Sequence, residues 1–262
     1  MPMYHTLEIE IANRVATIWM NRPDVHNAFD DILITELTQA CHALDANDDV
    51  RVVVLAGRGK SFSAGADLNW MKRAANNGTE ENLTDARALA NMLRALAEMT
   101  KPTIARVQGA ALGGGTGLTA ACDIAVASTK AVFATSEVKF GIIPSAISPY
   151  VIRAIGARHA YRYFQSAERL SAQRAYEIGL LHEVVEPEAL DAKVQEIVDA
   201  LVQGGPKAQA AAKALIRAVA NQPINDAVVE DTAQRIAHLR ATPEAKDGIA
   251  AFLDKRTPGW LA

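Results

Sequence analysis

The stretch that decides the fold is Gly109-Ala110-Ala111-Leu112-Gly113-Gly114-Gly115-Thr116-Gly117, a run of small residues between two different hydrophobic patterns. Residues 102–107 before it are predicted to form a strand, and a short helix is predicted to start among the glycines and end near Ala121. Glycine lets a backbone approach a ligand closely, and a helix N-terminus presents unpaired N–H groups. The run therefore fits a ligand-binding loop, although a simple tight turn would use the same residues.

A second loop of small residues, Ser61-Phe62-Ser63-Ala64-Gly65-Ala66-Asp67-Leu68, also follows a strand signal, the β-branched run at 51–56. If the two loops face each other, each can direct one backbone N–H at a carbonyl oxygen that gains negative charge during a reaction. Phosphate binding is a weaker interpretation. The glycines do not form the pattern G-x-G-x-x-G, and no Gly-Lys-Ser/Thr follows them.

Strand and helix signals alternate around these loops, which indicates an α/β fold of βαβ units with a mostly parallel sheet. A hairpin with its turn at Ala12-Asn13 comes first, and a helix is predicted from Asp30. After Ser148 the strand signals nearly vanish, so we divide the chain into an α/β core at 1–200 and a helical region at 201–262. The predicted strands are 5–11, 14–20, 51–56, 102–107, 122–127 and 132–135, and the predicted late helices are 190–201, 207–219, 224–240 and 243–255.

The composition argues against several classes of protein. The 262 residues are 50% hydrophobic and 22% charged with a formal net charge of -3, which disfavours a general binder of nucleic acid or of membrane surfaces. We expect neither a targeting segment nor a membrane-spanning helix. The two cysteines, Cys41 and Cys122, lack the spacing of a metal site, and so few thiols are typical of a cytoplasmic protein without disulfides.

Further motifs accompany the two loops. Met20-Asn21-Arg22-Pro23 precedes them, Lys101-Pro102-Thr103-Ile104-Ala105 leads into the glycine run, and Ala121-Cys122-Asp123-Ile124 follows it. Together and in this order, the motifs and loops resemble the crotonase (enoyl-CoA hydratase/isomerase) superfamily over nearly the whole chain. The resemblance implies a crotonase-like spiral of βαβ units with a C-terminal helical appendage. It also implies a homotrimer or a hexamer built as a dimer of trimers, with 201–262 as the trimerisation region.

The resemblance also implies a chemistry. In this family the N–H groups of Ala66 and Gly114 would hold the thioester oxygen of an acyl-CoA and stabilise the enolate that forms. Of the two carboxylate positions known in the family, the second falls on Glu137 and the first on Gly117, which cannot transfer a proton. A glutamate near an apolar acyl pocket would have a raised pKa, which suits general acid/base catalysis.

Coenzyme A would follow the same loops. The expected substrate-binding residues are Asp24, His26, Ala28, Ala64, Ala66, Asp67, Leu68, Gly113 and Gly114, together with Lys255. Lys255 and Phe252 are expected to contact the coenzyme from a neighbouring subunit, whereas His26 fits an ordinary surface histidine as well. Because coenzyme A is part of the substrate, no separate cofactor and no metal are expected.

Two stretches, 67–72 and 140–151, resemble the bacterial methylglutaconyl-CoA hydratases. The common hydratases carry more glycine where 145–148 stand here. This resemblance implies a branched, acidic enoyl-CoA from leucine breakdown, or an isoprenoid relative of it. An acidic acyl tail needs a cation, and Lys72, Arg73 and Arg153 are candidates that also fit solvated surface charges.

Three functions stay open. A hydratase would use Glu137 to activate water, and an isomerase would use the same carboxylate to move a proton between two carbons. A non-catalytic acyl-CoA or RNA-binding module would keep the fold without the chemistry. Retention of Glu137 and of the glycine loop speaks against the third, and the acidic charge balance speaks against RNA.

Overall fold

The first two strands form a hairpin in the structure, a computed structural model that describes residues 3–261. Strand β1 (Leu7–Ala12) pairs antiparallel with β2 (Val15–Met20). The turn residues are Asn13 and Arg14, with φ of 51° and 67°, so the predicted turn at Ala12-Asn13 is wrong by one residue. A two-residue hairpin turn of this kind needs positive φ at both positions, which Asn tolerates better than Ala.

The main sheet contains six strands in the order β1-β2-β3-β4-β6-β9. After the first hairpin all neighbours run parallel: β3 (Val52–Gly57), β4 (Thr103–Val107), β6 (Ile124–Ser128) and β9 (Glu183–Val185). Every residue of β3 is buried, as its continuous apolar run predicted. After Ser148, where strand signals were expected nearly to vanish, the described residues contain two short strands, β8 (Leu170–Ser171) and β9, and β9 pairs with β6.

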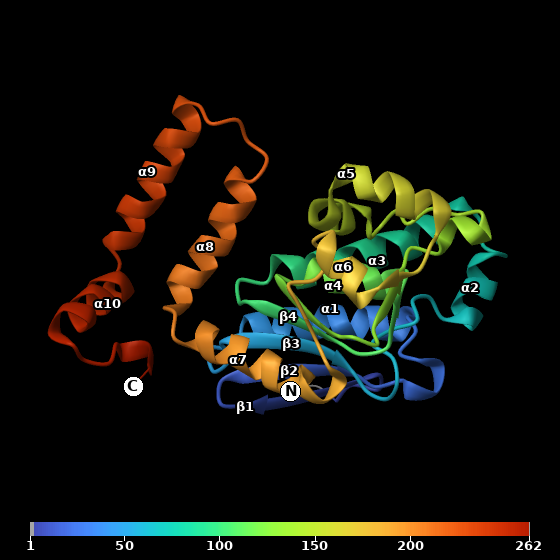
Figure 1. Ribbon diagram of the computed structural model, residues 1–262, viewed down its shortest axis with the longest axis horizontal. Helices are drawn as coiled ribbons and strands as arrows, with labels where there is room; N and C mark the ends of the chain where they lie inside the picture. Colours follow the sequence, from blue (N-terminus) through green and yellow to red (C-terminus); the bar gives the residue numbers. More distant parts are fainter. Residues whose placement is uncertain (1–2, 262) are drawn as a thin grey trace.

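Helices cover both faces of this sheet (Figure 1). On one face, α1 (Asp31–Asp45) and α3 (Thr79–Glu98) contribute to the main hydrophobic core. On the other, α7 (Leu190–Val202) buries Leu190, Val194 and Val198 against apolar residues of β3, β4 and β6. The sheet is therefore covered on both faces, which explains its continuous hydrophobic strands.

A small second sheet positions the glycine run. Its order is β5 (Ala110–Leu112), β7 (Val132–Ala134) and β8 (Leu170–Ser171), and β5 lies inside the stretch predicted as a loop. Helix α4 (Gly114–Ala121) begins among the glycines as predicted. The remaining core elements are η1 (Pro23–Val25), α2 (Leu68–Ala74), η2 (Glu137–Phe140), α5 (Ser148–Ser166), α6 (Ala172–Glu177) and η3 (Pro187–Ala189).

The last three helices form an arm that extends away from the sheet (Figure 1). This C-terminal arm comprises α8 (Pro206–Val219), α9 (Asp226–Arg240), α10 (Pro243–Asp254) and η4 (Gly259–Leu261). Several side-chain contacts attach α8 to the core; among them, Lys213 Nζ lies 2.6 Å from Asp123 Oδ2, and Arg217 donates to the carbonyl of Ala97 over 2.6 Å. The predicted α/β fold with a C-terminal helical appendage is confirmed, while the division at 200/201 falls within the last turn of α7.

Candidate active site

The two loops of small residues lie side by side. The N–H of Ser63 donates to the carbonyl of Ala110 over 3.0 Å, and the N–H of Leu112 donates to the carbonyl of Ser63 over 2.9 Å. A Cβ placed on Gly65 would lie 2.8 Å from the Leu112 oxygen and 3.6 Å from the Gly114 nitrogen. The loop that carries Ala66 therefore comes close to the start of α4, as the facing-loop hypothesis requires.

The backbone N–H groups of Ala66 and Gly114 are available to a ligand. The residues on either side of Ala66 both bond to Phe29: the N–H of Phe29 donates to the carbonyl of Gly65 over 2.6 Å, and the N–H of Asp67 donates to the carbonyl of Phe29 over 2.8 Å. The N–H of Ala66 itself has no acceptor within residues 3–261. Gly114 is the first residue of α4, where an N–H has no partner inside the helix. Both residues are partly exposed, and the Gly65 position next to Ala66 lies near the Gly114 nitrogen.

Close packing requires glycine at this helix start. A Cβ on Gly114 would lie 2.2 Å from Cε2 of Phe29, and one on Gly115 would lie 2.5 Å from the carbonyl oxygen of Ser63. Phe29 is itself 1% exposed and has little room to move. The glycine run is therefore a consequence of loop-to-helix packing as well as of ligand access.

Glu137 lies against the same helix start. The N–H of Gly113 donates to the carbonyl of Ala134 at the end of β7 over 2.8 Å, and Glu137 follows three residues later as the first residue of η2. Its Oε1 would lie 3.3 Å from a Cβ on Gly113. Its Oε2 is buried and has no hydrogen-bond partner in the described part of the chain. Burial raises the pKa of this carboxyl, and only its own backbone N–H opposes that rise.

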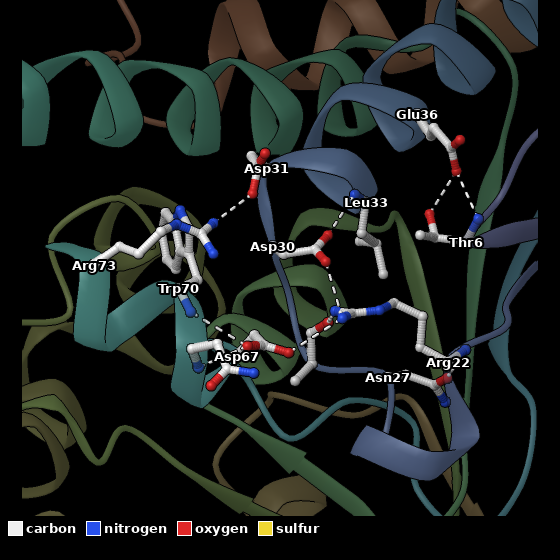
Figure 2. A network of polar contacts seen from close by, with 12 residues as sticks. Thr6, Arg22, Asn27, Asp30, Asp31, Leu33, Glu36, Asp67, Trp70 and Arg73 are labelled. Carbon is white, nitrogen blue, oxygen red and sulfur yellow. Dashed lines mark hydrogen bonds and ion pairs between the residues drawn. The ribbon is translucent and has the colours of Figure 1, made fainter.

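A charged clamp that the sequence interpretation missed supports the Ala66 loop (Figure 2). Arg22 Nη2 lies 2.9 Å from Asp30 Oδ2 and also pairs with Asp67, while Nη1 of the same residue donates to the carbonyl of Ala28. Asp30 caps α1 by accepting from Leu33 N over 2.9 Å. Arg22 and Asp67 both stand in the family-like motifs, where Asp67 was predicted only to bind substrate and Arg22 had no predicted role, so this pairing needed the structure.

The clamp also lowers a pKa. Burial by itself would raise the pKa of Asp67, but N–H donation from Asn69 and Trp70 and the charge of Arg22 hold it below its ordinary value. Asp67 accepts from Asn69 N over 2.8 Å and so caps α2. Asp67, which follows Ala66, is therefore an ionised helix cap whose partners are the N–H groups of Asn69 and Trp70 and the guanidinium of Arg22.

The other predicted binding residues of the core gather beside the Ala66 loop. His26 Nδ1 lies 3.1 Å from Ser61 Oγ, and the carbonyl of His26 accepts from Ala64 N over 2.9 Å. Asp24 and His26 are exposed, whereas Ala28 is buried. Leu68 is 74% exposed at the start of α2. The structure thus brings the 24–28 segment to the 64–68 loop, leaving exposed polar and apolar groups at its edge.

Lys255 and Phe252 do not join this group within one chain. Both lie at the end of α10 in the C-terminal arm, at the opposite end of the molecule from α2 (Figure 1). Phe252 is 83% exposed. A role for either residue at the site therefore needs a second copy of the chain.

A cavity of 730 Å³ lies elsewhere, between α1 and α3, and no predicted site residue lines it. The candidate active site is defined by its unbonded donors and its buried carboxylate and not by cavity size. Within residues 3–261 no group of three or more His, Cys, Asp or Glu side chains is arranged to hold a metal. Across the same residues, no helix has both the length and the apolar character needed to cross a membrane.

Comparison with known proteins agrees with this geometry. The family model for enoyl-CoA hydratase/isomerase matches residues 10–262. An enoyl-CoA hydratase structure from Shewanella pealeana has 42% identity and a TM-score of 0.95, covering 98% of this chain and 96% of that one. The crotonyl-CoA hydratase of Syntrophomonas wolfei is 31% identical over 99% of both chains. The trans-2-decenoyl-acyl-carrier-protein isomerase of Streptococcus mutans is 30% identical over 95% of both.

The match over nearly the whole chain defines the class of protein as a crotonase-fold enzyme that acts on acyl thioesters. The chain belongs to the enoyl-CoA hydratase/isomerase family.

Proposed function

We propose that this chain is an enoyl-CoA hydratase, which adds water to an α,β-unsaturated acyl-CoA. The observation that carries the proposal is Glu137, whose Oε2 is buried without a partner in the described residues and whose Oε1 would lie 3.3 Å from a Cβ on Gly113, the residue before Gly114. Leaving a carboxylate buried and unpaired costs stability. Its position against the start of α4, where the Gly114 N–H has no partner inside the helix, supports a use in catalysis.

In the proposed reaction the thioester oxygen accepts hydrogen bonds from Ala66 and Gly114. Glu137 removes a proton from a water molecule while the water oxygen bonds to C3 of the acyl chain, and the electrons of the C2=C3 bond move to the thioester oxygen as an enolate. Glu137 then returns the proton to C2 as the enolate collapses. One water is added, and because one carboxylate serves both steps, both new bonds form on the same face.

Methylglutaconyl-CoA is the proposed substrate, as part of leucine degradation. The support is the resemblance of residues 67–72 and 140–151 and the presence of candidate cations for an acidic tail. Arg73 pairs with Asp31 over 2.7 Å, so the proposal assigns the tail to Lys72 or Arg153, both of which are exposed. Apart from coenzyme A, which belongs to the substrate, the proposed reaction includes no cofactor.

A screen of enoyl-CoA thioesters with mass detection tests this function. We expect methylglutaconyl-CoA to gain the mass of one water in buffer that contains only enzyme and substrate. Hydration of another enoyl-CoA in its place would contradict the substrate and keep the reaction. Binding of CoA esters without turnover would favour a non-catalytic module and contradict the proposal.

An isomerase is the second candidate, and one observation favours it: Glu137 has no carboxylate partner at Gly117. A single carboxylate suffices to move a proton between C2 and C4, and the S. mutans isomerase matches this chain over 95% of its length. Isomerisation leaves the mass unchanged. Conversion of a 3-enoyl-CoA without gain of mass, and without hydration of any 2-enoyl-CoA, would replace the hydratase assignment.

We further propose that the chain works in the cytoplasm as a homotrimer or as a dimer of trimers. Large apolar side chains are exposed on each α-helix of the C-terminal arm and between α8 and α9, and they support assembly, because exposed apolar surface can mark contact sites; they are Ile216, Ile224, Val229, Ile236, Ile249, Phe252 and Leu253. In such an assembly Lys255 would reach a neighbouring site. Light scattering on the purified protein tests the state, and a monomer would contradict it.

A further inference from the structure

Gly117 lies in the first turns of α4, where the family-like pattern has a carboxylate. It is buried, and its N–H donates to the carbonyl of Gly113 over 3.1 Å. Gly113 and Gly117 therefore lie on adjacent turns of one helix face. The carboxylate of Glu137 lies where a side chain on Gly113 would point, with Oε1 3.3 Å from the Cβ position.

Ile147 occupies the corresponding position next to Gly117. A Cβ on Gly117 would lie 2.2 Å from Cγ2 of Ile147, 2.8 Å from its Cβ and 3.7 Å from its Cα. The first two distances are too short for real atoms, and the third is an ordinary contact. Alanine at 147 would therefore still collide with a side chain at 117, and only glycine would leave room.

Ile147 has little freedom to move away. It is 3% exposed, belongs to the main core and caps α5, with its carbonyl accepting from Tyr150 N and Val151 N over 3.1 Å each. We infer that Ile147 is the specificity-determining residue that takes the place of the missing acid: its side chain fills the space beside Gly117, the first of the two carboxylate positions, and restricts the site to chemistry with one carboxylate.

This inference deepens the proposed function and rests on it for its catalytic part. By the resemblance described above, the common hydratases are expected to carry more glycine at 145–148 and a glutamate at the position of Gly117. Here the small residue is on α4 and the large one precedes α5. The large side chain therefore stands at Ile147 instead of at position 117, and an aliphatic side chain occupies the space that an acid at 117 would need.

A thermal unfolding cycle tests the packing without any substrate. Gly117→Ala is expected to lower the unfolding midpoint of the wild-type chain, because the new methyl group meets Ile147. In the Ile147→Gly background the same substitution is expected to raise the midpoint, because alanine stabilises a helix relative to glycine. The sign of the effect should reverse. Equal effects in both backgrounds would overturn the inference.

The catalytic part is tested with Gly117→Glu/Ile147→Gly, a pair of changes that restores room and acid together. We expect the ratio of hydration to isomerisation to rise at least about tenfold over wild type, since one added acid or base group contributes about that much or more. An unchanged ratio in a folded double variant would overturn Ile147 as a determinant. An inactive wild type would instead contradict the proposed function and leave the unfolding cycle intact.

Discussion

Arg22 Nη2 lies 3.1 Å from Oδ2 of Asp67, the residue that follows Ala66 and caps α2. The same nitrogen contacts Asp30, the cap of α1. The side chains of Arg22 and Asp67 are 20% and 9% exposed, so water screens this pair less than it screens a surface pair. One guanidinium thus joins two helix starts, and Ala66, whose N–H is proposed to bind the thioester oxygen, directly precedes the cap of the second.

Arg22→Met should lower both stability and turnover. The change leaves two carboxylates with one partner fewer, and lost hydrogen bonds to charged groups cost about 1.5–3 kcal/mol. We expect a destabilisation of about 2 kcal/mol by denaturant unfolding and a fall in kcat larger than any change in KM. The control is Arg235→Met, which removes an exposed pair with Asp231 and should cost under about 1 kcal/mol. Equal losses in both variants would show that the clamp has no special role.

Glu137→Gln should remove activity and preserve the fold. General acid/base groups contribute about 10²–10⁴-fold to rate, so we expect kcat to fall within that range on the best enoyl-CoA. Because Oε2 has no partner in the described residues, the substitution breaks no hydrogen bond of that atom. Glu188→Gln, at an exposed glutamate, is the matched control and should be as active as wild type. Full activity of Glu137→Gln would mean that the base is another group.

Glu137 also predicts a pH dependence. Burial raises its pKa above the ordinary value of 4.5, and only the ionised form accepts a proton, so kcat/KM should fall as the pH falls through the raised pKa. The folded state binds this proton more tightly than the unfolded state. The stabilisation of the folded state by the protonated Glu137 is therefore fully present below the pKa of the unfolded state and is lost as the pH rises through the pKa of the folded state.

The stability part is measured as the difference in free energy of unfolding between Glu137→Gln and wild type. That difference should be larger at neutral pH, in favour of the variant, and should shrink as the solution is acidified. A difference that grows on acidification would mean that Glu137 is stabilised as an anion by a partner.

The pattern of residues within one segment predicted those helices and strands whose formation depends on that segment alone. The apolar run of β3, the stripe of α1 and the helix start at Gly114 all follow from spacing within one segment. The short strands β5 and β9 have only three residues each. Such strands depend on pairing with distant segments, and the sequence carries no periodicity to reveal them.

The same distinction applies to the site. The N–H donors were predicted from the glycine run and the family-like motifs, because backbone groups need no side-chain partner to be recognised, and their role stays a prediction. Arg22 and Asp67 are 45 residues apart, and the Gly117–Ile147 pair is visible only when α4 packs near α5. Sequence spacing cannot show that a large side chain in one segment fills the space left by a small one in another.

Lys213→Met should loosen the C-terminal arm. Lys213 Nζ pairs with Asp123 Oδ2 over 2.6 Å, and the side chain of Lys213 is 11% exposed. Burial lowers the pKa of Lys213, while Asp123 opposes that change. Loss of this hydrogen bond between charged groups should cost about 2 kcal/mol and speed amide hydrogen exchange in α8. Lys207→Met, at an exposed lysine of the same helix, is the control. Unchanged exchange in α8 would place the attachment of the arm elsewhere.

Gly114→Ala tests the oxyanion-binding geometry most directly. The added Cβ would lie 2.2 Å from Cε2 of buried Phe29, so either the ring or the start of α4 must move. Movement of the helix start redirects the Gly114 N–H, and loss of one such donor costs about 10²–10³-fold in kcat. We expect a fall in that range, with KM for the CoA ester changed much less, because the donor acts mainly on the enolate.

The matched control is Gly78→Ala, also at a helix start, where the new Cβ would meet Glu81 Oε2 at an ordinary 3.5 Å. It should leave kcat within about twofold of wild type, because surface changes that create no clash have small effects. Phe29→Leu combined with Gly114→Ala separates the two ways in which the clash is relieved. If the smaller side chain restores kcat, the ring had displaced the donor. If Gly114→Ala alone keeps full activity, the Gly114 N–H does not hold the thioester oxygen.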